Sequence, residues 1–131
     1  MQTTLAIAAC LAVITGIVHS VLGELLIFRP MRRGTLVITS NTGQLKQRSV
    51  GILWATWHIA SVFGWAFAVV LGQRALDPGA AMVTLVLGAA VLAYSASALL
   101  VLIGTRGRHP GWVALTMVAA LTWVAAGGAV A

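Results

Sequence analysis

The sequence predicts an all-α integral membrane protein, an antiparallel bundle of four transmembrane helices that forms a single domain over residues 1–131. Hydrophobic residues make up 60% of the chain and charged residues only 8%, whereas about a quarter of a soluble domain is charged. Such a chain has too little polar surface to cover an apolar core in water, so lipid is the expected solvent. Four apolar segments reach the length of about 20 residues that a helix needs to cross a bilayer.

Three connections separate the four expected helices. The helices are expected over about 4–28, 49–72, 79–104 and 111–130, and a longer loop over about 29–48. Arg29 and Pro30 are expected to end the first helix, because proline has no backbone N–H and disfavours a helical residue before it. Asp77-Pro78-Gly79 is a turn sequence. So is Gly107-Arg108-His109-Pro110, whose proline suits the start of the last helix.

The basic residues indicate topology rather than nucleic-acid binding. The net charge is +6, but the eight basic residues lie between the apolar segments and not along one face that could follow phosphates. In chain order the three connections carry five, one and two of them, and basic loops favour the cytoplasm. The first and third connections are therefore expected in the cytoplasm and both termini outside it, as in a bacterial inner-membrane protein. The same residues attract anionic lipid headgroups.

The remaining motifs exclude several kinds of chemistry. The single cysteine, Cys10, lies within the first apolar segment, so the sequence has no disulfide pair, no CxxC motif and no CxxCH motif for covalent haem attachment. The first segment is expected to be retained as a span, because it has no positive region before it and no AxA-type cleavage site. The sequence contains no established catalytic motif, and it therefore does not predict whether the protein is an enzyme.

Small residues recur at every fourth position in three of the expected helices. These ladders are Ala8, Ala12, Gly16 and Ser20; Thr56, Ala60, Gly64 and Ala68; and Ala89, Ala93 and Ser97. Helices in lipid gain contact through close approach of their backbones, which small residues permit. The ladders are expected to hold the bundle together, and the alternative is that some of them form a homodimer interface.

Three ionisable residues lie within the expected spans: His19 and Glu24 in the first helix, and His58 in the second. A charged side chain at that depth costs about 2.5–3.5 kcal/mol, so each is a candidate functional residue. His19 lies nine residues before Phe28, and His58 lies nine residues after Ser49. At about 1.5 Å per residue, both imidazoles are expected roughly 13 Å from the cytoplasmic ends of adjacent helices, and therefore at one level.

Two imidazoles at one level are a candidate bis-His site for a metal or a non-covalent b-type haem. The candidate cofactor-binding residues are His19, His58, Gly16, Gly23, Trp54, Arg29 and Arg48. The glycines would leave flat space beside His19, Trp54 would line the ring, and the arginines would meet the propionates. Alternatively, each histidine hydrogen-bonds to a neighbouring helix and the tryptophans only pack.

Glu24 has two open interpretations. It lies five residues after His19 and so about 140° around the helix, which excludes a chelate of the two within one helix. We expect either an ion pair with Arg29, Arg33 or Arg48, or a carboxylate that carries protons. The leading functional hypothesis is electron relay through haem. The alternatives are a small proton-coupled transporter, acting as a homo-oligomer, and an accessory or assembly subunit of a larger membrane complex.

Overall fold

The computed structural model describes residues 1–33 and 47–128, and within them the chain is helical apart from short turns. The elements are α1 (Gln2–Leu22), the π-helical segment η1 (Gly23–Phe28), α2 (Arg29–Arg33), α3 (Gln47–Leu76), α4 (Met82–Thr105) and α5 (Gly111–Gly128). No strand occurs in these two ranges, so the all-α prediction is confirmed for them.

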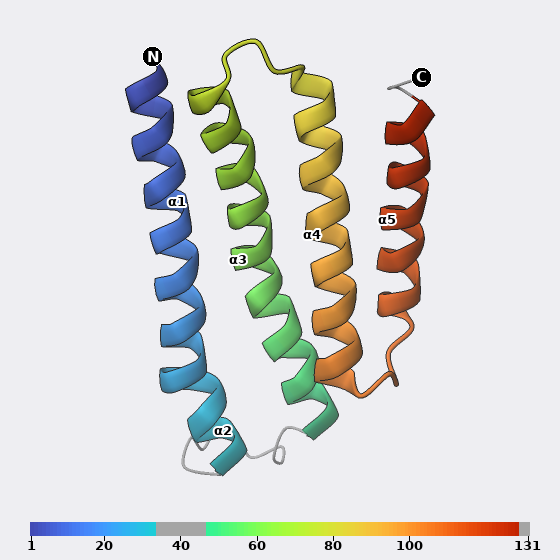
Figure 1. Cartoon of the computed structure of the whole chain (residues 1–131). Coiled ribbons are helices and arrows are strands. Elements are labelled where there is room, and N and C mark those ends of the chain that lie inside the picture. The colour runs from blue at the N-terminus through green and yellow to red at the C-terminus, as the bar shows by residue number, and fades with distance from the viewer. Residues whose placement is uncertain (34–46, 129–131) are drawn as a thin grey trace.

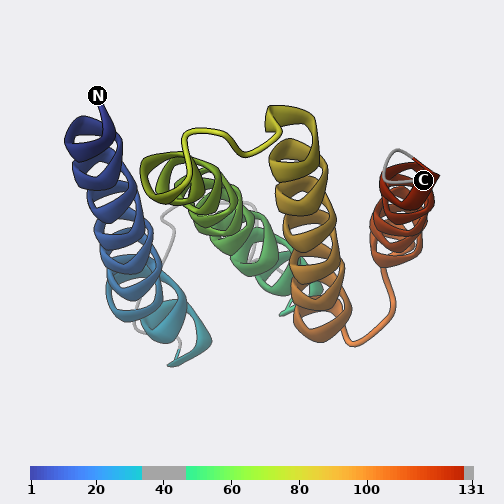
Figure 2. The ribbon, with the colours of Figure 1, turned by 45° about the horizontal axis from the view of Figure 1, so that its top comes forward.

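The long helices stand side by side in one row, in the chain order α1, α3, α4, α5, with each antiparallel to the next (Figure 1). Each packs on its neighbour in the row, but in the described part of the chain α1 makes no contact with α4 or α5. Figure 2 shows α1 and α5 at opposite edges of the row. The packing is therefore open, and the compact four-helix bundle that the sequence predicts is not confirmed.

Three helical stretches within the described ranges are long and apolar enough to span a membrane: Gln2–Arg33, Ser49–Leu76 and Met82–Thr105, with mean hydropathies of 2.3, 1.5 and 2.3. The last apolar helix, over Gly111–Ala126, is shorter. Large apolar side chains point outward along the row, among them Phe67 and Trp123, which are 66% and 69% exposed. Such a surface suits lipid rather than water.

The first helix does not end at Arg29 and Pro30, contrary to the sequence prediction. It continues to Arg33, because a π turn precedes the proline: the N–H of Arg29 donates to the carbonyl of Glu24, five residues earlier. In a regular α-helix the ring of Pro30 would collide with the carbonyl four residues before it. The wider turn of η1 takes up one extra residue and relieves this collision.

The two predicted turns are present, although the helix ends beside the first one shift. α3 runs on to Leu76, and α4 begins only at Met82. In the second turn Arg106 and Gly107 both have positive φ, 52° and 73°. The N–H of Gly107 donates to the carbonyl of Leu102 at 2.8 Å, which caps α4. This turn fixes where Arg106 and Arg108 lie.

Small residues form much of the packed interior, and the ladders supply only part of it, since Thr56 and Ala60 are exposed. Ala68, Ala93 and Ser97 are among the buried residues, at 4%, 1% and 0% exposure. α3 and α4 approach closely where Gly51 meets Gly104, since a Cβ on Gly51 would overlap the Gly104 carbonyl oxygen. The largest buried side chain is Phe28, at the end of η1.

Candidate functional site

The polar residues of α1 and α3 meet at one level of the interface between these helices. The ring of His19 stacks on the indole of Trp57, with centroids 4.4 Å apart and planes 5° apart. Trp57 Nε1 also donates to the His19 carbonyl at 3.1 Å. His58 follows Trp57 directly and bonds to Ser20, which follows His19. The two histidines thus lie at one level, but the face of His19 is covered by an indole.

His58 belongs to a hydrogen-bonded chain that crosses from α3 to α1 and back. Its Nδ1 lies 2.9 Å from Ser20 Oγ, and the Ser20 hydroxyl donates to Ser61 Oγ at 2.8 Å. Ser61 is only 3% exposed. A serine hydroxyl has a single proton, so Ser20 donates to one of these partners and accepts from the other, and the direction follows the tautomer of His58. When Ser20 donates to Ser61, the ring proton of His58 lies on Nδ1 and a lone pair on Nε2.

Both imidazoles keep one buried nitrogen without a hydrogen-bond partner. Within the described residues, Nε2 of His19 and Nε2 of His58 are buried and unpartnered. Leaving such an atom unpaired costs about 1–3 kcal/mol, so a native protein that retains two of them at one site invites a functional explanation. Either nitrogen can accept a proton or ligate a metal.

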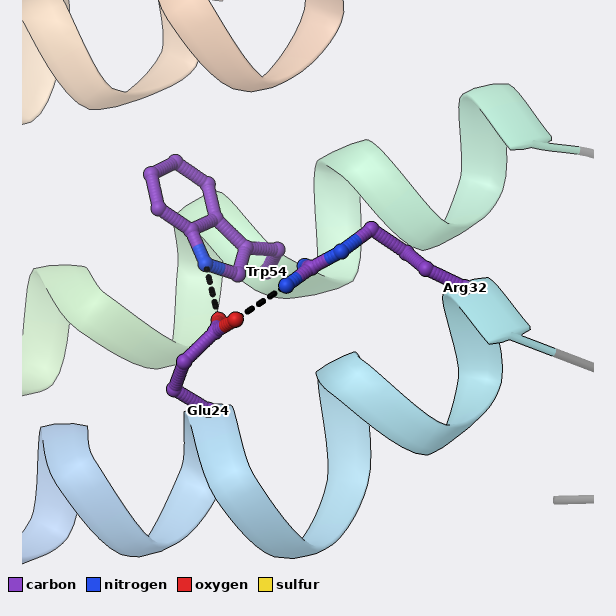
Figure 3. Close-up of polar contacts among 3 residues, drawn as sticks. All are labelled: Glu24, Arg32 and Trp54. Atoms are coloured by element: carbon purple, nitrogen blue, oxygen red, sulfur yellow. Dashed lines mark hydrogen bonds and ion pairs between the residues drawn. The ribbon is translucent and has the colours of Figure 1, made fainter. Parts of the chain in front are cut away.

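Glu24 is held by Arg32 and Trp54 (Figure 3). Arg32 Nη2 forms an ion pair with Glu24 Oε1, and Trp54 Nε1 donates to Glu24 Oε2 at 3.1 Å. The indole of Trp54 also contacts the ring of His58 edge-on, with centroids 4.7 Å apart. Trp54 therefore touches both the carboxylate and the imidazole, and it joins the ion pair to the hydrogen-bonded chain.

An ion pair of Glu24 was expected, but its partner is Arg32 and not Arg29 or Arg33. Eight residues along a regular α-helix turn a side chain by about 80° from its starting face. The extra residue of η1 removes one step of about 100°, which leaves Glu24 and Arg32 within about 20° of each other. Arg29 is exposed on α2. The third expected partner, Arg48, has a side chain outside the described residues.

The flat space expected beside His19 is occupied by tryptophan. A Cβ on Gly16 would overlap the indole of Trp65, and a Cβ on Gly23 would overlap the indole of Trp57. The space beside these two glycines, where the sequence predicts room for a porphyrin, therefore holds indole rings in the present packing of α1 and α3. Nor do three or more His, Cys, Asp or Glu side chains converge on a metal position in the part of the chain that is described.

An open groove of about 350 Å³ lies beside this cluster, between α1 and α3. It is lined by Ala12, Thr15, Gly16, His19, Ala60, Ser61 and Gly64. Four of these belong to the small-residue ladders, and their lack of bulk leaves the groove. His19, Ser61 and Thr15 bring polar groups to its otherwise apolar wall.

Sequence reasoning missed Ser20, Ser61 and Trp57 as members of the site. The signal was available, because Ser20 adjoins His19 and Ser61 lies three residues after His58, on the same helical face. The site therefore combines His19, Ser20 and Glu24 of the first helix with Trp54, Trp57, His58 and Ser61 of the next.

Comparisons of this chain with protein-family models, with curated proteins and with solved structures found no match.

Proposed function

We propose that this chain is a four-span membrane protein that conducts protons into the membrane interior through Glu24, His58, Ser20 and Ser61. The protons enter from its basic end, which is the end of the row with α2 and the turn after α4. The observation that carries the proposal is the hydrogen-bonded chain from His58 to Ser61, set among apolar residues. Chains of this kind are typical of proton relays within membranes. α5 serves as the fourth span, since its 18 residues reach about 27 Å of a core of about 30 Å.

The proposed proton transfer begins at Glu24, whose side chain is partly exposed. Glu24 takes a proton from water and passes it to the lone pair on Nε2 of His58. The imidazolium then releases its Nδ1 proton to Ser20, whose own hydroxyl proton moves to Ser61, and Ser61 gives its own hydroxyl proton to an acceptor in the groove beside it. One proton enters and one leaves, so the relay is balanced. Carboxylate and imidazole both contact Trp54, and the step between them requires a water molecule or a side-chain movement.

The groove beside Ser61 is the proposed destination of the proton. Its wall is apolar apart from His19, Ser61 and Thr15, which suits a lipophilic acceptor or a side chain from a partner. The sequence between Asp77 and Arg106 has no acidic or basic residue to continue the path. A complete route across the bilayer therefore requires a second copy of this chain, which purified protein in a vesicle can supply. In this proposal the basic end faces the cytoplasm and both termini lie outside it, as in a bacterial inner membrane.

Proton flux into liposomes tests this function. We expect purified protein in vesicles to collapse an imposed pH gradient, read by an entrapped pH-sensitive dye with a potassium ionophore to balance charge. Ser20→Ala removes the link between His58 and Ser61 and is expected to lower the flux at least tenfold. Ser95→Ala, at an exposed serine of α4, is the matched control and keeps it. Equal flux in the two variants, or no flux above that of empty vesicles, contradicts the proposal.

A metal or haem held by His19 and His58 is the second candidate, favoured by their two unpartnered Nε2 atoms. Haem binding would require Trp57 and Trp65 to leave the space beside α1. An absorption spectrum of protein from haem-replete cells decides whether haem is bound. A Soret band that disappears in both His19→Ala and His58→Ala supports haem and electron relay, and a colourless protein rules them out.

A further inference from the structure

A second concave site lies at the basic end of the row, on the side of Trp54 and Arg32 toward α4. It has a volume of about 350 Å³, and three arginines line it: Arg32 from α2, and Arg106 and Arg108 from the turn after α4. Val50, Trp54 and Ile103 form its apolar side. Residues far apart in the sequence thus bring three guanidinium groups to one pocket.

The backbone accounts for this convergence. α3 and α4 touch at Gly51 and Gly104, both in the wall of the pocket, where side chains on either glycine would force the helices apart. Directly after this crossing, Arg106 adopts the left-handed conformation at φ 52° and reverses the chain. Thr105, also in the wall, donates its hydroxyl to the Val101 carbonyl at 2.6 Å. Its proton is therefore used within α4, and the arginines are the charged donors of the pocket.

The charge balance of the pocket is positive. Of the two acidic residues in the sequence only Glu24 lies at this end, where it pairs with Arg32. Three guanidinium groups of the pocket therefore stand against a single carboxylate. The first turn of α3 also lies at this end, and the N-terminus of a helix carries a partial positive charge and N–H groups without helical partners. Guanidinium groups bind phosphate oxygens in pairs of parallel hydrogen bonds. An oxyanion of phosphate type matches this arrangement.

We propose that this pocket binds a phosphate group at the membrane surface. Two sources carry that chemistry: the headgroup of an anionic phospholipid, and a soluble phosphate compound. Val50 and Ile103 extend the wall into the apolar spans, where an acyl chain would continue from a headgroup. The site requires neither histidine, but it adjoins the proposed proton relay, because Arg32 and Trp54 line the pocket and also hold Glu24.

Lipid retention and phosphate titration test the proposal together. In the first arm, detergent-purified protein is incubated with phosphatidylglycerol or phosphatidylcholine, and bound lipid is counted by native mass spectrometry. In the second arm, inorganic phosphate is titrated by calorimetry. The Arg106→Gln/Arg108→Gln double variant is expected to lose about tenfold or more in affinity, since each charged hydrogen bond contributes measurably. The control is Arg29→Gln/Arg33→Gln, which removes equal charge at the same end from exposed residues outside the pocket.

The outcomes distinguish a lipid headgroup from a soluble phosphate compound, and both of these from general surface charge. Selective loss of phosphatidylglycerol in the pocket variant assigns the site to a lipid headgroup, and selective loss of inorganic phosphate binding assigns it to a soluble compound. Equal losses in both double variants indicate general surface charge and overturn the proposal, as does the absence of binding in both arms. Ile103→Trp fills the pocket without changing charge, and it is expected to weaken binding to a similar extent. If the pocket double variant fails to fold, this variant alone decides, because unchanged binding in it overturns the proposal.

Discussion

The two outer interfaces of the row, α1 with α3 and α4 with α5, are built from different chemistry. At the first, three tryptophans of α3 donate their indole N–H groups to α1 and η1: Trp65 to the Val13 carbonyl, Trp57 to the His19 carbonyl and Trp54 to the Glu24 carboxylate. At the second, the described side-chain hydrogen bonds of α5 stay within its own helix or turn. In lipid, where apolar contact gives little drive between helices, such bonds specify a register.

This difference separates a specified interface from a permissive one. At the α1–α3 interface the indole N–H groups and the serine hydroxyls are hydrogen-bonded, and the glycines leave room for the indole rings. These contacts together favour one arrangement of the two helices. The α4–α5 interface gains mainly dispersion contact between small residues, such as the buried Ala119. A functional polar site needs fixed geometry, so the specified interface is the one that can hold it.

The largest loss of stability is expected from substitution of the glycines that leave room for the indoles. Gly23→Ala places a Cβ against the ring of Trp57, and overpacking of this kind costs about 1–3 kcal/mol. Gly88→Ala on α4 is the matched control, because no atom lies within 4 Å of its added Cβ. There the change is expected to be neutral, or to stabilise by up to about 1 kcal/mol through helix propensity.

Unfolding in mixed micelles of dodecyl maltoside and SDS, followed by circular dichroism, measures both variants. The same experiment reads the tryptophan emission, which is expected to change in Gly23→Ala as Trp57 moves. Equal stability of the two variants would mean that the indole of Trp57 yields freely, and the contrast between the interfaces would then be lost.

The next largest loss of stability is expected from substitution of the hydrogen-bonded serine Ser20. Ser20→Ala leaves His58 Nδ1 and the Ser61 hydroxyl without their shared partner, at a cost of about 1–3 kcal/mol. Ser97→Ala on α4 removes a hydroxyl that is fully buried and, within the described residues, unpartnered. That variant is expected to be neutral or more stable, since the unpaired polar group is lost. Thermal unfolding in detergent ranks the two, and the reverse order would refute the assigned hydrogen bonds.

The sequence predicted the helices well, because apolar length in lipid leaves few alternatives. Apolar runs bounded by Asp77-Pro78-Gly79 and by Gly107 to Pro110 defined α3, α4 and α5 to within a few residues. The end of the first helix was wrong, because propensity rules treat Pro30 as a stop and do not foresee the π turn before it. The open row is not predicted from the sequence, because helix lengths do not determine which nonadjacent helices touch.

The site was predicted in part for the same kind of reason. Counting residues from the helix ends placed His19 and His58 at one level, since the rise per residue is fixed. Counting could not show that Trp57 covers His19, or that Gly16 and Gly23 receive indoles, because these depend on how the two helices rotate about their axes. The partner of Glu24 was missed through the π turn alone, which brings Arg32 onto its face.

The smallest effect is expected at that ion pair. The side chains of Arg32 and Glu24 are 45% and 35% exposed, and solvent-screened pairs contribute about 0–1 kcal/mol. Arg32→Gln is therefore expected to lower stability by less than about 1 kcal/mol, and by less still at high salt. Trp54→Phe removes the N–H donor but keeps the ring against His58, at a cost of about 1 kcal/mol that salt does not change. Unfolding measured at two salt concentrations distinguishes them, and a salt-insensitive loss in Arg32→Gln would show that the arginine acts through packing and not through charge.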